Sequence, residues 1–283
     1  MANNWLEKSN RNSLMFTHYF APFSVPVKIF LLLNRLSIHR SSYMSITDKL
    51  ARQFLKQAIV LSKKELSEGI FHLIIKGQDL VNLTYLPGQH LRVFVGMDMD
   101  VAMSDKVRTY SVWRYDNKMG IMDLMVCTHA NGPGSLWANE LREGEEIYFT
   151  SPKGKFTLDL SAQQYLFIGD ITTLAHFYEI KRNLPTTKHV KGILYADHIH
   201  DLVPDLDGSF PFEFYELPPY PLEQLKALLD KELPLDTNDC MVYVGGDGRV
   251  CVELLRHLKK TKGMNGKNIK VKPFWMPGKK GLE

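Results

Sequence analysis

Arg108-Thr109-Tyr110-Ser111 and the later run His129-Ala130-Asn131-Gly132-Pro133-Gly134-Ser135-Leu136-Trp137 are the two most informative stretches of this sequence. The first follows a predicted strand and places a cation, an aromatic ring and a hydroxyl on an extended segment. Successive side chains of a strand point to opposite faces, so we expect Arg108 and Tyr110 to share one face. The second is a glycine-rich turn before an apolar, helix-compatible segment. Together they predict a site for a ligand with a phosphate end and a flat ring, which is the shape of a flavin dinucleotide.

Each part of this predicted site has a chemical role and an ordinary alternative. The guanidinium of Arg108 suits a pyrophosphate, the ring of Tyr110 can lie against a flavin, and Ser111 can bond the ring edge. The glycines allow close approach to a phosphate, and a helix starting near Ser135 would point its N–H groups at that phosphate. The alternatives are a surface arginine beside a core tyrosine, and a tight turn with an N-capping serine. The order and spacing of the pair favour the binding site.

Composition and charge exclude several classes of protein. The chain has 283 residues and a formal net charge of +4, with lysines and arginines spread along it. No basic stripe is interleaved with aromatic residues, so we do not expect a nucleic-acid partner. The three cysteines, Cys127, Cys240 and Cys251, lack C-x-x-C spacing. This argues against zinc, iron–sulfur and disulfide sites and favours a reducing, cytoplasmic location. We expect Cys240 and Cys251 to be buried, and no metal site.

The N-terminal region is predicted to be an extension. The apolar stretch Phe20–Leu33 is interrupted by Pro22 and Pro26 and is too short to span a membrane. Met44 begins a run that has the character of a domain start. We therefore expect residues 1–43 to be poorly ordered and the protein not to insert stably into a membrane.

The remainder predicts two domains: an antiparallel β-barrel over residues 44–160, then a parallel-sheet α/β domain over residues 161–283. Short strands punctuated by turn residues indicate the barrel, with one helix at Ser135–Leu141. Its predicted strands are Phe54–Leu61, Ile70–Ile75, His90–Val95, Thr109–Trp113, Ile121–Cys127 and Glu146–Thr150. Alternating strands and helices indicate the parallel sheet. These elements are strand Gln164–Ile168, helix Thr172–Asn183, strand Val190–Tyr195, helix Pro221–Leu229, strand Cys240–Val244, helix Arg249–Lys260 and strand Ile269–Phe274.

Two loops of the α/β half are candidates for a second nucleotide. Gly169-Asp170-Ile171-Thr172-Thr173 follows a buried strand and opens a helix, and Gly245-Gly246-Asp247-Gly248 does the same later in the chain. Ligands of such domains bind outside the carboxyl ends of the strands, so both loops are expected to face one crevice. The G-x-G-x-x-G fingerprint is absent, and ordinary connections are the alternative. His129 is either a cofactor contact or a satisfied polar residue, and Trp275 either a core residue or a cover for a ring.

These stretches resemble the siderophore-interacting protein family, the flavin-containing ferric-siderophore reductases of the ferredoxin–NADP reductase superfamily. The resemblance runs from about residue 50 to the end. It is carried by Leu86-Pro87-Gly88-Gln89-His90, Arg108-Thr109-Tyr110-Ser111, His129 through Ala138, Gly169-Asp170 with Thr172, and Phe274-Trp275-Met276-Pro277-Gly278. It implies an FAD-binding barrel followed by an NAD(P)-binding domain.

The resemblance also implies roles for individual residues. Arg108 would meet the FAD pyrophosphate, Tyr110 and Ser111 the flavin and its ribityl chain, and Gly132, Gly134 and Ser135 a phosphate. The complete set of expected cofactor-binding residues is Arg108, Thr109, Tyr110, Ser111, His129, Gly132, Pro133, Gly134, Ser135, Trp137, Gly169, Asp170, Thr172, Thr173, Gly246, Asp247 and Trp275. No catalytic acid or base is assigned.

The sequence departs from the family pattern in the expected nicotinamide pocket. Residues 169–176 are Gly-Asp-Ile-Thr-Thr-Leu-Ala-His where the family has G-D-E-T-A-L-P-A, so Ile171 replaces the glutamate and His176 the last alanine. Asp247 replaces a later glutamate. Arg249, Lys279 and Lys280 are the candidates for binding an anionic siderophore.

The expected activity is NADH- or NADPH-dependent, FAD-mediated reduction of ferric iron in a siderophore by a monomeric enzyme. Alternatives are the same fold with another acceptor, such as free flavin, a ferredoxin or a quinone-like molecule, and a non-catalytic flavin-binding protein.

Overall fold

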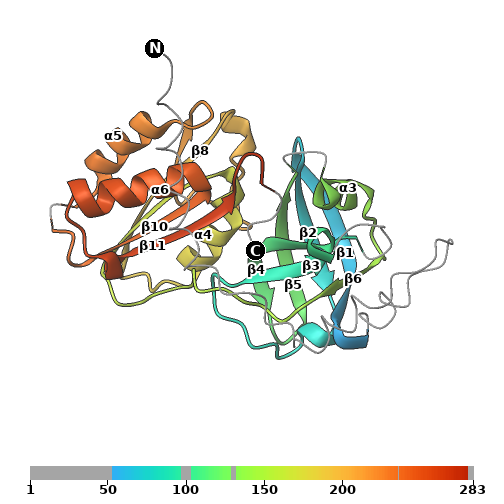
Figure 1. Ribbon diagram of the computed structural model, residues 1–283. Coiled ribbons are helices and arrows are strands. Elements are labelled where there is room, and N and C mark those ends of the chain that lie inside the picture. The colour runs from blue at the N-terminus through green and yellow to red at the C-terminus, as the bar shows by residue number, and fades with distance from the viewer. Residues whose placement is uncertain (1–52, 97–102, 129–131, 235, 280–283) are drawn as a thin grey trace, which may run out of the picture. The chain divides into compact units, whose positions relative to one another are not determined.

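The computed structural model describes residues 53–96, 103–128, 132–234 and 236–279 (Figure 1). The predicted N-terminal extension, residues 1–43, lies outside these ranges. Among the described residues, every helix falls short of the length and apolar character needed to cross a membrane.

The first half of the described chain is a closed antiparallel barrel, as predicted. Its strand order is β1-β2-β5-β4-β3-β6. The bounds are β1 Lys56–Ser67, β2 Ile70–Lys76, β3 His90–Phe94, β4 Val107–Asp116, β5 Ile121–Cys127 and β6 Glu146–Phe149. Alternating side chains of these strands fill the barrel, among them Leu73, Leu91, Val93 and Leu124, which are fully buried. Helix α3, Pro133–Glu140, packs Ala138 into the same core.

The second half is a parallel sheet, as predicted, and its strand order is β11-β10-β7-β8-β9. Its strands are β7 Gln164–Asp170, β8 His189–Ala196, β9 Glu213–Glu216, β10 Cys240–Asp247 and β11 Ile269–Trp275. The helices between them are α4 Leu174–Arg182, α5 Leu222–Glu232 and α6 Gly248–Arg256, the last continued by a π-helical turn at His257–Thr261. Short 3-10 turns lie at Gln78–Leu80, Met103–Lys106, Ile171–Thr173, Ile199–Asp201 and Gly266–Asn268.

Both faces of this sheet are covered, so its central strands are almost continuously apolar. Leu166 and Ile168 of β7 pack with α5 and α6 on one face. Tyr165 and Phe167 point the other way and pack with α4. Every residue of β10 is buried, including Cys240, and Cys251 of α6 is buried too. The predicted burial of these two cysteines is confirmed.

The larger differences from the sequence prediction concern β9, β1 and α3. Strand β9 was not predicted. Strand β1 runs on to Ser67 with two irregularities in its pairing to β2, instead of ending at Leu61. Helix α3 begins at Pro133, with Gly132 rather than Ser135 at the N-cap and no side-chain cap, because proline suits the first helical position. The first parallel strand starts at Gln164, and the exact division at residues 160 and 161 stays a prediction.

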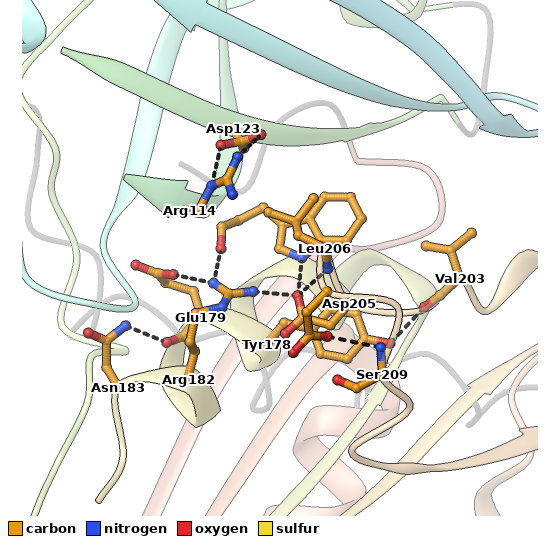
Figure 2. A network of polar contacts seen from close by, with 12 residues as sticks. Arg114, Asp123, Tyr178, Glu179, Arg182, Asn183, Val203, Asp205, Leu206 and Ser209 are labelled. Atoms are coloured by element: carbon orange, nitrogen blue, oxygen red, sulfur yellow. Dashed lines mark hydrogen bonds and ion pairs between the residues drawn. The ribbon is translucent and has the colours of Figure 1, made fainter. Parts of the chain in front are cut away.

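A buried polar network ties barrel strand β4 to helix α4. Arg182 of α4 is ion-paired with Glu179 and with Asp205, as Figure 2 shows, and its Nη1 also donates to the carbonyl oxygen of Trp113 at 2.7 Å. The indole Nε1 of Trp113 donates to Asp205 Oδ1 at 2.8 Å. Each end of the Trp113 residue is therefore held by the α/β half.

Candidate cofactor-binding site

The structure brings Arg108, Tyr110 and the start of α3 together. Strand β4 carries the two side chains on one face, as the alternation predicted, and α3 begins beside them. A Cβ placed on Gly134 would lie 3.0 Å from Arg108 Cγ and 3.1 Å from Tyr110 Oη. Only glycine fits there without displacing a neighbour, so the first turn of α3 lies directly against the arginine and the tyrosine.

The chemistry of these neighbouring groups suits a dinucleotide phosphate. The first N–H groups of a helix lack intrahelical partners and carry a partial positive charge, which favours an anion. Pro133 occupies the first helical position, and the N-cap Gly132 offers no side chain that would compete for those groups. Arg108 Nη1 donates to the carbonyl oxygens of Asp105 at 3.1 Å and Val107 at 2.6 Å, so the guanidinium belongs to this end of β4.

The aromatic part of the predicted site is built from two rings. Tyr110 is buried, at 8 % exposure, and stacks on Trp137 of α3 with ring centroids 5.5 Å apart. Ser111 and Thr109 lie on the opposite face of β4. Ser111 is buried, and Thr109 Oγ1 is buried with no hydrogen-bond partner among the described residues. An orphaned hydroxyl of this kind can serve a bound ligand. His129, predicted beside this group, lies outside the described residues.

The residues predicted to bind the second nucleotide also lie close together. Asp170, at the end of β7, accepts hydrogen bonds from Thr172 N at 3.0 Å and Thr172 Oγ1 at 2.5 Å. Its other oxygen accepts from Asp247 N and from the Trp275 indole Nε1, both at 2.8 Å. The carboxyl ends of β7, β10 and β11 thus meet on one side chain. Gly246 has a φ of 102°, and a Cβ there would clash with the Asp170 carboxylate.

Asp170 is a buried acid whose four hydrogen bonds described above come from neutral donors. Burial raises its pKa above the ordinary value, and the four hydrogen bonds oppose this shift. Burial and, secondarily, the Asp170 carboxylate also raise the pKa of the Cys127 thiol to about 12. Cys127 ends barrel strand β5, close enough to the carboxyl end of β7 for the Asp170 charge to act on its thiol. Sequence reasoning gave Cys127 no role, because a lone cysteine carries no local signal.

The remaining predicted residues are placed as follows. Gly169 and Thr173 lie in close contact beside Asp170. Arg249 is bound to both carboxylate oxygens of Asp247 and lies over the Tyr220 ring at 4.8 Å, so it has partners within the fold. Lys279 is exposed beyond β11, and Lys280 lies outside the described residues.

His176, which departs from the family pattern, is fully buried in α4. Its Nε2 is bonded to Phe156 O at 2.9 Å, and burial lowers its pKa to about 3. Ile171 is half-buried in the 3-10 turn that precedes α4.

Residues 57–158 match the family model described as "Oxidoreductase FAD-binding domain", which supports FAD as the ligand of the barrel. The toluate 1,2-dioxygenase electron transfer component of Pseudomonas putida is 28% identical over 151 residues, which is 52% of this chain and 43% of that protein. The chain thus matches less than half the length of this curated relative.

Two solved structures are similar across most of the chain. They are the siderophore-interacting protein SipS from Aeromonas hydrophila (TM-score 0.67, 19% identity, 80% of this chain and 93% of that one) and a siderophore-interacting protein from Acinetobacter baumannii (TM-score 0.67, 14% identity, 80% and 92%). At these identities the likeness establishes the fold. This chain therefore has the two-part fold of the siderophore-interacting proteins, with an oxidoreductase FAD-binding sequence in its barrel.

Proposed function

We propose that this protein is an FAD-dependent oxidoreductase that takes electrons from NADH or NADPH and reduces ferric iron held by a siderophore. The observation that carries the proposal is the contact of Gly134 with Arg108 and Tyr110. It joins a cation, an aromatic ring and a helix N-terminus in one place, and each of the three suits a different part of a flavin dinucleotide.

The residues of the barrel would hold FAD by its phosphates and its ring. Arg108 and the N–H groups of Gly134 and Ser135 would bind the pyrophosphate, because all of them are donors and carry positive charge. Tyr110, backed by Trp137, would support a flat ring. Thr109 and Ser111 supply hydroxyls on the opposite face of β4.

The nicotinamide donor would enter at the carboxyl ends of the parallel strands, as in other open α/β sheets. Ferric iron accepts one electron whereas a nicotinamide donates two, and bound FAD supplies the conversion between them. The chain's own part is positional: Asp170 fixes the Thr172 turn, the Asp247 backbone and the Trp275 indole. We assign no general acid or base, because electron transfer requires none.

The FAD-binding part would extend over residues 44–160 and the nicotinamide-binding part over residues 161–283, in a cytoplasmic monomer. Of the cations suggested for the siderophore, Arg249 already pairs with Asp247. Lys279, which is exposed, and Lys280 are therefore better candidates for steering an anionic chelate.

A second candidate acceptor is an iron–sulfur protein. The 28% identity to an electron transfer component of a dioxygenase favours it, since that protein's name describes electron delivery and not iron release. A non-catalytic flavin-binding protein is the remaining alternative.

Anaerobic absorbance spectroscopy tests the proposal. We expect purified protein to carry flavin or to take up added FAD, to lose the flavin absorbance with NADH or NADPH, and to recover it with a ferric siderophore. Recovery only with a ferredoxin would favour the second candidate. A flavin that neither nucleotide bleaches would overturn the proposal that this protein is an enzyme.

Arg108→Ala should weaken FAD binding at least about tenfold, the effect of one charge-assisted hydrogen bond. The exposed Arg142→Ala on the same barrel should not weaken it.

A further inference from the structure

The loop after strand β8 places an exposed acid at a position that matters for nucleotide choice. Strand β8 ends at Ala196, and Asp197 follows it with its side chain in solvent. Strand β8 lies next to β7, whose loop carries the Asp170 cluster. In a doubly wound domain, an acid after the second strand bonds the adenosine ribose 2′-hydroxyl of NAD, whereas a nearby arginine accommodates the 2′-phosphate of NADP.

A second acid stands beside Asp197. Glu216 ends strand β9 and pairs in register with Ala196. Its Oε2 accepts a hydrogen bond from Ile199 N at 2.9 Å, so this carboxylate is turned onto the loop that Asp197 begins. The carboxyl ends of β8 and β9 therefore carry two neighbouring carboxylates.

The surrounding sequence adds negative charge and no lysine or arginine. Between Lys191 and Lys226 there is neither residue type, and the acids there are Asp197, Asp201, Asp205, Asp207, Glu213, Glu216 and Glu223. His198 and His200 lie on the loop itself, exposed and stacked on each other with ring centroids 5.4 Å apart.

Arg249 is a cation whose charge acts on this end of the sheet, and it already has an acidic partner. It contributes to the electrostatic environment of Tyr195, the residue before Ala196. Its guanidinium binds both oxygens of Asp247 and covers Tyr220. A 2′-phosphate would therefore compete with the Asp247 carboxylate for this guanidinium.

We propose that NADH, and not NADPH, is the donor, with Asp197 as the specificity-determining residue. The proposal rests on the proposed function, because it assigns the donor of the same site. Asp197 would accept a hydrogen bond from the ribose 2′-hydroxyl. A 2′-phosphate has no hydroxyl to donate there and would bring negative charge against Asp197 and Glu216, which is unfavourable.

Binding and reduction measurements on the holoprotein test this inference. By isothermal titration calorimetry, ADP-ribose should bind at least about tenfold more tightly than its 2′-phosphate, a difference on the scale of one desolvated like-charge contact. Anaerobic flavin reduction should show the same preference for NADH over NADPH. Equal binding, or a preference for the phosphorylated ligand, would overturn the inference while leaving the reductase intact. If neither nucleotide reduces the flavin, the proposed function fails instead.

The variant Asp197→Asn sharpens the test. Its amide oxygen can still accept from the ribose hydroxyl, but the charge is gone. We expect NADPH to gain about fivefold relative to NADH, the contribution of one unit charge a few ångströms away across water. Asp207→Asn removes the same charge from the same acidic stretch and should leave the ratio unchanged. An unchanged ratio in Asp197→Asn, or an equal change in both variants, would refute the assignment of Asp197.

Discussion

Arg182→Met should destabilise the folded chain strongly, and more at high pH than at low pH. The guanidinium is ion-paired with Glu179 and Asp205, whose side chains are only 6% and 5% exposed (Figure 2). Without Arg182 both carboxylates remain buried and lose their cation. Removing one partner of a buried ion pair costs about 3–5 kcal/mol. Because Arg182 itself is 32% exposed, solvent screens part of the interaction, and we expect about 3 kcal/mol at pH 8.

The pH dependence follows from Glu179. Burial raises its pKa from 4.5 to about 7 even though Arg182 opposes the shift. A folded-state pKa above the unfolded one means that the folded chain binds more protons between those values. The stability this acid contributes is therefore present at low pH and lost as the pH rises towards 7. Without Arg182 the pKa should rise further, so protonation should recover more of the lost stability at pH 5.5.

Urea unfolding in excess FAD, followed by tryptophan fluorescence at pH 8 and pH 5.5, measures both effects. Arg256→Met is the matched control, since its ion pair with Glu253 is exposed and should contribute under about 1 kcal/mol. Glu179→Gln combined with Arg182→Met should recover part of the loss at pH 8 and none at pH 5.5. A cost for Arg182→Met no greater than that of Arg256→Met, or one independent of pH, would refute this account of the network.

Three further predictions concern the rest of the site. Burial is the main cause lowering the pKa of His90 to about 2 and of His176 to about 3, so the unfolded chain binds more protons below pH 6.5. In urea titrations of the Glu179→Gln variant, the free energy of unfolding should therefore decrease as the pH is lowered, by up to about 1.4 kcal/mol per pH unit for each histidine. A free energy of unfolding that does not change with pH would contradict the burial. Gly134→Ala should lower FAD affinity at least about tenfold in a fluorescence titration while far-UV circular dichroism keeps its α3 contribution, because alanine favours helices but its Cβ meets Arg108 and Tyr110; unchanged affinity would place the phosphates elsewhere. Asp170→Asn should lower the free energy of unfolding, measured in urea, by about 3 kcal/mol, because an amide NH2 in place of Oδ2 cannot accept the hydrogen bonds from Asp247 N and Trp275 Nε1. Wild-type stability would mean that the amide is accommodated.

The fold could be predicted from local sequence patterns, and the errors in that prediction also have local causes. The barrel strands and the parallel strands follow from apolar alternation and from continuous apolar runs, respectively. Strand β9 escaped because Glu213–Glu216 is short, lies at the edge of the sheet and begins and ends with an exposed glutamate. The start of α3 was misplaced because Ser135 is a favourable N-cap, whereas the structure uses Pro133 at the first helical position and needs no cap.

The candidate site was predictable only where its parts lie close in sequence or follow a known order. Arg108 and Tyr110 share a face because of strand geometry, and Gly134 follows them closely in the sequence, after the β4–β5 hairpin. The bond between Asp170 and Trp275 spans 105 positions and depends on β7 and β11 both flanking β10. No local pattern encodes that pairing. The same holds for Trp113 and Asp205, which are 92 positions apart.

The two halves of the candidate site are held by different interactions, so a substitution in one half should affect the other half less. The flavin half is built on adjacent barrel elements, so its geometry should survive changes in the α/β half. The donor half depends on the single carboxylate of Asp170, whose two oxygens hold three strand ends. The halves are related through Trp113, which Arg182 and Asp205 hold by its carbonyl and its indole. A change at Arg182 that leaves the chain folded should therefore slow flavin reduction by NADH more than it weakens FAD binding, since it disturbs the placement of the halves and neither half itself. Equal effects on both would mean that the FAD site also depends on this network.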